Sequence, residues 1–224
     1  MGRFDRSESG WNNRIKLAQA YGAKVITDIK TGATFPSAHP QHVSTPSFFL
    51  TPEGKEAVAD SDLIVSFDWV DLAGDIGDLA FGRVVVEVSM DHQLTNGWSC
   101  DHMGLSEVDL AIASSPDLVV QGLIDCVQGQ STAHQPLKLK KQSVDIGAHQ
   151  STTTPKTFAA VINQSFSSES VCFVRLPLGW NGADLNLNHP LDYLGYDGGA
   201  GIGSGPGMVV GAALALRGSS RIAV

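Results

Sequence analysis

Short apolar segments alternate along this chain with segments whose apolar residues recur at helical spacing. The predicted strands are 24–28, 63–67, 83–89, 110–113, 170–176 and 221–224, and the predicted helices are 11–21, 52–60, 115–127, 155–166 and 208–216. Strands that are apolar throughout and alternate with helices are typical of a parallel sheet covered on both faces. The pattern therefore predicts an α/β fold, with a Rossmann-like parallel sheet and flanking helices followed by a partial second α/β domain.

Two stretches interrupt the pattern. Residues 31–48 are rich in Gly, Pro and His and are expected to form a loop. Residues 131–154 are dominated by Gln, Ser, Thr, His, Lys and Pro and have no apolar period, which is typical of a linker. The chain is thus divided into a Rossmann-like region 1–130, a linker 131–154 and a second α/β region 155–224.

Composition excludes several classes of protein. The 224 residues carry a formal net charge of -8, and the one basic cluster, Lys138, Lys140 and Lys141, lies in the predicted linker, so a nucleic acid is not an expected partner. The longest apolar run, 208–216, is far shorter than the roughly 20 residues of a membrane span. Three widely spaced cysteines and a polar N-terminus without a secretory signal favour a reduced, cytoplasmic setting.

The candidate ligand site is a glycine-rich segment, residues 192–207, which precedes the predicted helix 208–216 and the strand 221–224. Ligands of open α/β sheets bind beyond the carboxyl ends of the strands. A glycine run can also be a flexible loop, or a phosphate loop that holds an anion on bare backbone amides. The spacing Gly-x-Gly-x-x-Gly does not fit at any register through 195–207, so a dinucleotide fingerprint is not supported.

This C-terminal segment resembles the start of the diphosphate-binding domain of thiamine-diphosphate-dependent enzymes, the superfamily of acetolactate synthase, pyruvate decarboxylase and benzoylformate decarboxylase. The matching residues are Ala200 to Gly205, Gly211 to Leu216 and Arg221 to Val224. The first region resembles the central domain of the same enzymes, most closely acetolactate synthase-like proteins. Its matching residues are Gly2-Arg3, Trp11, Arg14, Leu17-Ala18, Gly22-Ala23, Phe35-Pro36, His39-Pro40, Ala59 to Ile64 and Asp68 to Leu72.

The resemblance implies a cofactor-binding role for four residues. Ile202 matches a bulky apolar side chain that props thiamine diphosphate in a bent shape, and the backbone carbonyl of Ala200 matches the acceptor for the aminopyrimidine. Gly201 and Gly203 would let the main chain approach the rings closely. The cofactor itself carries the chemistry, through an ylid that adds to a 2-oxo acid. The implied parent enzyme, a lyase or transferase, decarboxylates a small 2-oxo acid, with or without carboligation, and is expected to be a homo-oligomer.

The chain departs from the family in three places. The Gly-Asp-Gly motif that holds Mg2+ would begin directly after Val224, and the domain that supplies the activating glutamate would lie before Met1. An apolar strand is also expected directly ahead of Gly2-Arg3. We therefore expect a fragment that is inactive alone, with no catalytic residue and no metal ligand assigned, and the sequence does not specify the 2-oxo acid.

Three other sets of polar residues could be interpreted as sites. The first is Asp91, His92, Cys100, Asp101 and His102; the second is His39, His42 and His189; the third is Asp68, Asp71, Asp75 and Asp78. The first set lacks the paired spacing of a structural zinc site, so metal binding is not expected. The histidines lie in proline-rich loops, where structural or surface roles are expected.

The acidic string supports an alternative function. It follows the predicted strand 63–67, at the edge of the sheet where a Rossmann-like fold holds its ligand. Because some relatives bind a flavin or an adenine nucleotide in the central domain, the chain could instead be a non-catalytic module that binds FAD or an adenine nucleotide, or that contacts a partner subunit. An acidic string repels a diphosphate unless cations intervene.

Overall fold

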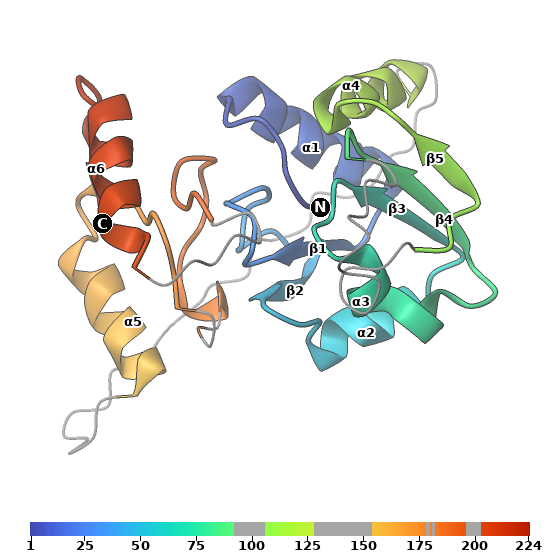
Figure 1. Ribbon diagram of the computed structural model, residues 1–224, viewed down its shortest axis with the longest axis horizontal. Helices are drawn as coiled ribbons and strands as arrows, with labels where there is room; N and C mark the ends of the chain where they lie inside the picture. The colour runs from blue at the N-terminus through green and yellow to red at the C-terminus, as the bar shows by residue number, and fades with distance from the viewer. Residues whose placement is uncertain (92–105, 128–153, 178–179, 181, 196–202) are drawn as a thin grey trace.

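The computed structural model describes residues 1–91, 106–127, 154–177, 180, 182–195 and 203–224. In the first region the elements are α1 (Glu8–Tyr21), β1 (Val25–Asp28), β2 (His42–Ser47), α2 (Pro52–Ala59), β3 (Leu63–Phe67), α3 (Leu72–Ile76), the 3-10 helix η1 (Gly77–Ala80), β4 (Val84–Val88), β5 (Leu110–Ile112) and α4 (Pro116–Val127). In the second they are α5 (Pro155–Ser165), β6 (Ser170–Cys172), the 3-10 helix η2 (Gly182–Asp184), α6 (Gly205–Ala215) and β7 (Arg221–Ala223) (Figure 1).

Every strand pairing among the named strands is parallel, which confirms the predicted α/β class. The strands form three sheets, with orders β1-β2, β3-β4-β5 and β6-β7. Helices α1 and α4 pack together on one face of β3-β4-β5, and α2 and α3 lie on the other (Figure 1). Both faces of this sheet are therefore covered, as its continuous apolar strands require.

Separate apolar clusters fill the two faces. On the side of α1 and α4 the buried residues are Leu17, Phe67, Val88, Val120 and Ile124. On the side of α2 and α3 they are Val58, Leu72, Ile76 and Val85. Val88 of β4 belongs to the first cluster and Val85 to the second, because their side chains point to opposite faces of the pleated strand.

The predicted loop 31–48 is wrong in its second half, which forms β2. Its sequence, HVSTPS, is polar and contains Pro46, and neither feature indicates a strand. Proline is tolerated because β2 is the edge strand of its sheet, where a missing N–H costs no ladder bond. Long-range pairing with β1, from Val25 to His42 onward, determines this strand.

Helix ends differ from the prediction where capping decides them. Helix α1 begins at Glu8, ahead of the predicted 11, because the Ser7 hydroxyl accepts a hydrogen bond from the Gly10 amide (3.0 Å). It ends at Gly22, which adopts a left-handed conformation with φ of 60°. Helix α6 begins at Gly205 instead of 208, with a proline in its first turn.

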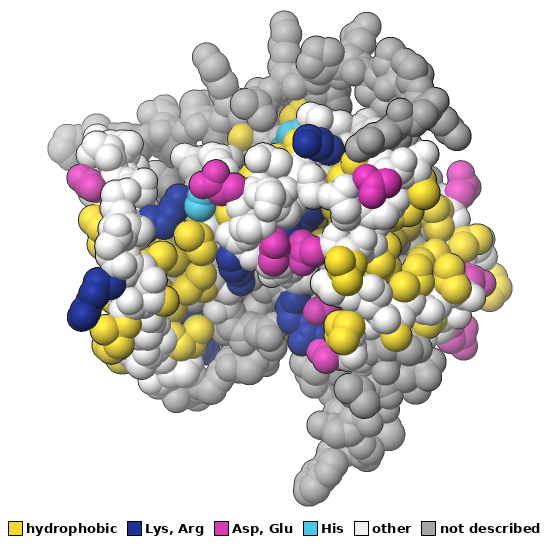
Figure 2. All heavy atoms as spheres, turned by 90° about the horizontal axis from the view of Figure 1, so that it is seen from above, with side chains coloured by type: hydrophobic (Ala, Val, Ile, Leu, Met, Phe, Trp, Pro, Cys, Tyr) yellow, Lys and Arg dark blue, Asp and Glu magenta, His cyan; other side chains and the backbone are white. Residues whose placement is uncertain are grey.

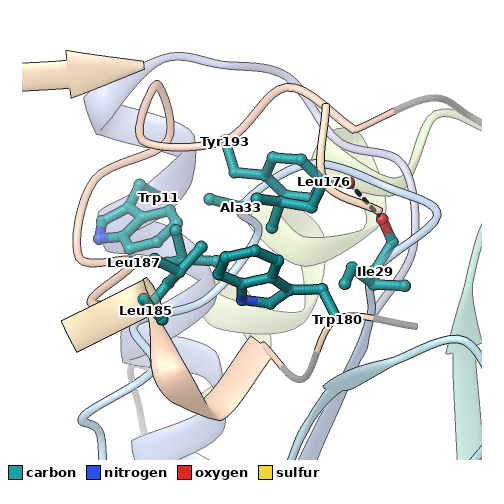
Figure 3. Close-up of a cluster of buried hydrophobic side chains, with 9 residues drawn as sticks. Trp11, Ile29, Ala33, Leu176, Trp180, Leu185, Leu187 and Tyr193 are labelled. Carbon is teal, nitrogen blue, oxygen red and sulfur yellow. Dashed lines mark hydrogen bonds between the residues drawn. The ribbon is translucent and has the colours of Figure 1, made fainter. Parts of the chain in front are cut away.

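The two regions share one core, shown in Figure 3. Trp11, Ile29 and Ala33 come from the first region, and Ala159, Leu176, Trp180, Leu185, Leu187 and Tyr193 come from the second. The Tyr193 hydroxyl donates a hydrogen bond of 2.7 Å to the backbone carbonyl of Ile29, drawn as a dashed line in Figure 3. Residues 131–153 of the predicted linker lie outside the described residues, its last residue, Thr154, is the N-cap of α5, and the regions on the two sides of the linker pack against each other.

Met1 is half-buried and lies between β1 and β3, where Figure 1 marks the N-terminus. The amino group of Met1 donates to the carbonyl of Ile26 (2.7 Å). Burial lowers the pKa of this amino group from 8.0 to about 5, against the smaller opposing effect of Asp28.

In the part of the chain that the structure describes, every helix falls short of the length and apolar character that crossing a membrane requires.

Replacing Tyr193 by Phe should lower the free energy of unfolding by about 1 kcal/mol, because the buried Ile29 carbonyl loses its donor. Chemical denaturation measures the change. The matched control is Tyr21→Phe, since Tyr21 is half exposed. Equal effects of the two substitutions would contradict the role given to the Tyr193 hydroxyl.

The buried amino group of Met1 should make stability depend on pH. Its pKa is lower in the folded chain, so the unfolded chain binds more protons between pH 8 and about pH 5, and the free energy of unfolding should fall across this window as pH falls. The loss is up to about 4 kcal/mol. Nα-acetylation removes the titrating group, so the acetylated and free chains should diverge as pH falls in denaturation curves. Parallel curves would refute this assignment.

Candidate functional site

Of the four residues expected to bind the cofactor, only Gly203 is described, and Ala200, Gly201 and Ile202 lie outside the described residues. Gly203 is exposed and adopts a left-handed conformation with φ of 85°, which favours glycine. It precedes the first turn of α6, so the glycine-rich segment leads directly into this helix, as predicted.

Helix α6 connects two parallel strands, so its N-terminus lies at their carboxyl ends. Strands β6 and β7 pair from Ser170↔Arg221 to Cys172↔Ala223. Three residues after β6, the Arg175 guanidinium donates a hydrogen bond to the hydroxyl of Ser204, the N-cap residue of α6. The glycine-rich segment therefore reaches the position at which an open α/β sheet binds its ligand.

The glycines at this helix start have free space beside them among the described residues. A Cβ atom built on Gly203, Gly205 or Gly207 would meet no described atom within 4 Å apart from its chain neighbours and the backbone of its own helix. Glycines at such positions let a planar ring or a phosphate approach the main chain. The described part of the segment, from Gly203 to Gly207, thus leaves room for a ring or an anion beside the main chain.

Asp192, the first residue of the glycine-rich segment, is held in place by contacts of its carboxylate. One carboxylate oxygen lies 2.7 Å from the Arg221 guanidinium, and the other accepts hydrogen bonds from the backbone amides of Asn188 (2.7 Å) and His189 (2.8 Å). The Arg221 side chain also donates to the carbonyl of Val171 in β6 (3.0 Å). The loop entrance is therefore attached to both strands of the β6-β7 sheet.

Gly195 makes a second attachment. It forms an isolated antiparallel bridge with Thr31 and has a φ of 75°. A Cβ atom at this position would lie 2.5 Å from the Thr31 carbonyl carbon, so no larger residue fits without backbone movement. This contact ties the entrance of the loop to the first region.

The acidic string resolves into separate structural roles. Asp68 pairs with Arg3 (2.7 Å) and accepts from the Ser89 hydroxyl, and Asp71 accepts from the Gly74 amide at the start of α3. Asp75 accepts a hydrogen bond of 2.7 Å from the Trp69 indole. These contacts favour stabilisation of the loop after β3 over nucleotide binding.

The histidines have structural contacts. His39 Nδ1 accepts from the Gln41 amide (3.2 Å), and burial lowers the pKa of the His39 ring. His42 Nε2 lies 2.8 Å from the Thr27 hydroxyl, and His189 Nδ1 accepts from the Leu191 amide. The expected structural roles fit these contacts.

The candidate metal cluster is mostly outside the described residues. Of its members only Asp91 is described, and it pairs with Arg3. Among the described residues no group of three or more His, Cys, Asp or Glu is placed to hold a metal ion.

A small cavity of about 290 Å³ lies at the carboxyl ends of β1 and β3. The residues that line it are Gly2, Arg3, Phe4, Arg6, Thr31, Gly32, Thr34 and Leu194. Two arginines at the ligand-binding edge of a sheet could bind an anion. Arg3 already pairs with Asp68 and Asp91, and Arg6 already donates to three backbone carbonyls.

Sequence reasoning missed the polar residues that position the loop, namely Arg175, Asp192 and Arg221. Arg175 and Arg221 lie within predicted strands and Asp192 begins the glycine-rich segment, and a charged residue at such a position is ordinarily expected at the surface. Their partners lie 29 residues away for both Arg175–Ser204 and Arg221–Asp192. Only the parallel pairing of β6 with β7 would have brought them together in advance.

No protein-family model and no curated protein matches the sequence. The fold is similar to that of benzoylformate decarboxylase from Polynucleobacter necessarius, with a TM-score of 0.65 and 18% identity over 93% of this chain and 38% of that one. It is also similar to the Rhodococcus jostii RHA1 thiamine diphosphate-dependent 4-hydroxybenzoylformate decarboxylase, with a TM-score of 0.66 and 17% identity over 95% of this chain and 39% of that one. The chain thus has a fold found in thiamine-diphosphate-dependent decarboxylases and spans about two fifths of their length.

Replacing Gly195 by Ala should lower the free energy of unfolding by at least about 2 kcal/mol, because a left-handed alanine is strained and its Cβ overlaps Thr31. Gly207→Ala is the control: it lies in α6 beside open space, and alanine there should leave stability unchanged or raise it by up to about 1 kcal/mol. Thermal or chemical unfolding compares the two. A Gly195→Ala protein as stable as the control would disprove the close contact.

Proposed function

We propose that this chain supplies the central domain and the opening part of the diphosphate-binding domain of a thiamine-diphosphate-dependent 2-oxo acid decarboxylase. The observation that carries the proposal is the fold likeness to two such decarboxylases over 93% and 95% of this chain. Region 1–130 corresponds to the central domain and region 155–224 to the start of the cofactor domain. The parent reaction is decarboxylation of a small 2-oxo acid, with or without carboligation as in acetolactate formation.

In this proposal Ala200, Gly201, Ile202 and Gly203 contact the cofactor rings. The open space beside Gly203 and the start of α6 at the carboxyl ends of β6 and β7 support this placement. Asp192 and Arg175 act in this proposal as positioning residues, because their side chains bind the described chain on either side of residues 196–202.

Thiamine diphosphate, when bound, supplies a nucleophilic thiazolium carbon and an electron sink for loss of CO2 from a 2-oxo acid. The part that this chain plays is to orient the rings: Ile202 supplies an apolar wall, and the glycines supply close backbone contact. Mg2+ and a proton-transferring carboxylate belong, in this proposal, to parts of the parent enzyme outside this chain.

Apolar surface on the second region agrees with this role. Hydrophobic side chains gather at the end of the molecule that carries α5 and α6, at the left of Figure 2. The exposed residues there include Phe158, Val161, Val210 and Leu214. Helix α6 is apolar on all sides, which is typical of a helix buried in a larger domain. We propose that further parts of the parent enzyme, or a second subunit of a homo-oligomer, cover this end.

The chain alone should neither bind the cofactor tightly nor release CO2 from benzoylformate. Four residues without the diphosphate clamp provide too few contacts for micromolar affinity. Isothermal titration of the chain with thiamine diphosphate and Mg2+ measures binding, and CO2 release measures activity. Micromolar binding would refute the proposed division of the site.

The positive arm of this experiment is a chimera in which this chain replaces the matching 38% of the Polynucleobacter necessarius enzyme. Decarboxylation should fall at least tenfold with Ile202→Ala, because the apolar wall is lost, and it should be largely kept with the bulky Ile202→Leu. Equal activity of the two variants would argue against a ring contact at Ile202.

A second function, binding of FAD or an adenine nucleotide, is favoured by one observation, the cavity with Arg3 and Arg6. Its volume of about 290 Å³ lies at the lower limit of small-molecule pockets, which span about 300 to 1,000 Å³. A thermal shift with FAD and none with thiamine diphosphate would decide for this function.

A further inference from the structure

Three charged side chains are buried together beside the carboxyl end of β1. The Lys30 ammonium lies 3.1 Å from a carboxylate oxygen of Asp28 and 3.5 Å from one of Asp75, which belongs to α3. The exposed fractions of these side chains are 6% for Lys30, 0% for Asp28 and 5% for Asp75. Two carboxylates and one ammonium leave the cluster with one uncompensated negative charge, which is costly away from water.

Uncharged groups complete the surroundings of the cluster. The Lys30 ammonium donates to the backbone carbonyl of Phe48 (2.9 Å) and lies 4.8 Å from the centre of the Phe48 ring. The Trp69 indole donates to Asp75 (2.7 Å). These contacts hold the ammonium and one carboxylate in place and leave the excess negative charge as it is.

Two further titratable groups lie on the elements around Asp28. The Met1 amino group faces Asp28, but burial lowers the pKa of this amino group to about 5, so at neutral pH it is uncharged and does not compensate the carboxylate. On β2 the titratable side chain is His42, whose Nε2 lies 2.8 Å from the Thr27 hydroxyl.

The two oxygens of Asp28 differ in their contacts. Oδ1 accepts a hydrogen bond of 2.7 Å from the Lys30 amide and so fixes the start of the loop 29–33 that follows β1. Oδ2 forms the ion pair with the Lys30 side chain and accepts no hydrogen bond from a described residue. A proton can therefore bind Oδ2 without breaking a hydrogen bond, and it cancels the excess charge. Burial raises the pKa of Asp28 from 3.8 to about 6, against the opposing effect of Lys30, and Asp75 adds to the rise.

The loop 29–33 is also the surface on which the second region rests. The Ala33 amide donates to the Tyr193 carbonyl (2.8 Å), and Thr31 forms a bridge with Gly195. Opening of this loop would break these contacts and admit water to the charged cluster. Proton binding in the cluster is therefore coupled to the contact between the two regions.

We propose that the Asp28–Lys30–Asp75 cluster is a proton-sensitive joint between the two regions of the chain. When Asp28 takes up a proton at mildly acidic pH, the neutral cluster holds the loop 29–33 more firmly against the second region, and when the proton is lost the loop opens more often. The joint lies beside Gly195, at the entrance of the glycine-rich segment. This inference goes beyond the proposed function and does not depend on the cofactor site.

The direction of the effect follows from proton linkage. The pKa of Asp28 is about 6 in the closed loop and 3.8 where the carboxyl is hydrated, so the closed loop binds the proton more tightly. The contribution of this proton to loop closure is complete below pH 3.8 and is lost as pH rises through about 6. Between pH 7.5 and pH 5 the equilibrium constant for loop opening should therefore fall about tenfold.

The test compares the unaltered 224-residue chain with Asp28→Asn, an uncharged side chain of the same shape. Hydrogen exchange of the Ala33 amide, followed by NMR and corrected for the intrinsic exchange rate, gives the equilibrium constant for loop opening. The ratio of this constant in the unaltered chain to that in the variant should fall about tenfold from pH 7.5 to pH 5. The Met1 amino group acts on stability with the opposite sign, but it is present in both chains and cancels in the ratio.

Asp60→Asn is the matched control, because Asp60 is exposed and pairs with Lys24 outside the cluster. The corresponding ratio for this variant should not change with pH. Within the unaltered chain, the Ala33 amide should be less protected than the amides of Val86 and Val88 in β4, since the loop opens without the sheet. Equal protection would mean that the loop opens only when the whole fold unfolds, which overturns the joint.

A second measurement needs no variant, so the test stands even if Asp28→Asn fails to fold. Carbon-13 NMR of the carboxyl groups in the unaltered chain should show that Asp28 titrates with a midpoint near pH 6. A midpoint near pH 4 would overturn the proposal, as would an opening ratio that is independent of pH or a pH dependence that Asp60→Asn reproduces.

Discussion

The arrangement of the two regions depends on the hydrogen bonds that the Arg6 guanidinium, in the first region, makes to backbone carbonyls of the second. The guanidinium donates to the backbone carbonyls of Pro190 (3.3 Å), Tyr193 (2.8 Å) and Leu194 (2.6 Å). A planar, permanently charged fork can bond several carbonyls at once, which an ammonium group cannot do with the same geometry. Gly32 makes room for it, since a Cβ there would lie 1.8 Å from the guanidinium.

Fixing residues 190–194 in this way has two consequences. Tyr193 is held in the shared core, where its ring joins Trp11 and its hydroxyl reaches Ile29. Just after β6, the Phe173 amide donates to the Asp192 carbonyl and the Phe173 carbonyl accepts from the Leu194 amide, which gives the short sheet of the second region a parallel neighbour. The regions 1–130 and 155–224, predicted as separate domains, pack against each other through a common core, and the glycine-rich segment begins beside this core at Asp192.

The sequence predicted the elements that local signals determine, and it did not predict those that depend on residues far apart in the chain. Strand 63–67 and the start of helix 52–60 match β3 and α2 because apolar runs, a threonine cap and Pro52 are local signals. Strand β2 was missed because its partner, not its polar sequence, makes it a strand. The Asp192–Arg221 pair involves residues that are brought together only by folding. The fold class was predictable, whereas Ala200 to Ile202 of the candidate site rest on the resemblance alone.

A fold can persist at 17–18% identity because its requirements are general. A parallel sheet needs apolar strands and covering helices, and cores accept exchanges among Val, Ile and Leu at small cost. A functional site needs particular chemical groups at particular distances, so a similar fold does not imply the same substrate. In this chain the contacts at the two ends of the glycine-rich segment, from Arg175, Asp192 and Arg221, are polar and depend on exact geometry, unlike the apolar contacts of the core. Ile202, which the loop would present, is therefore a sharper probe of function than any residue of the sheet.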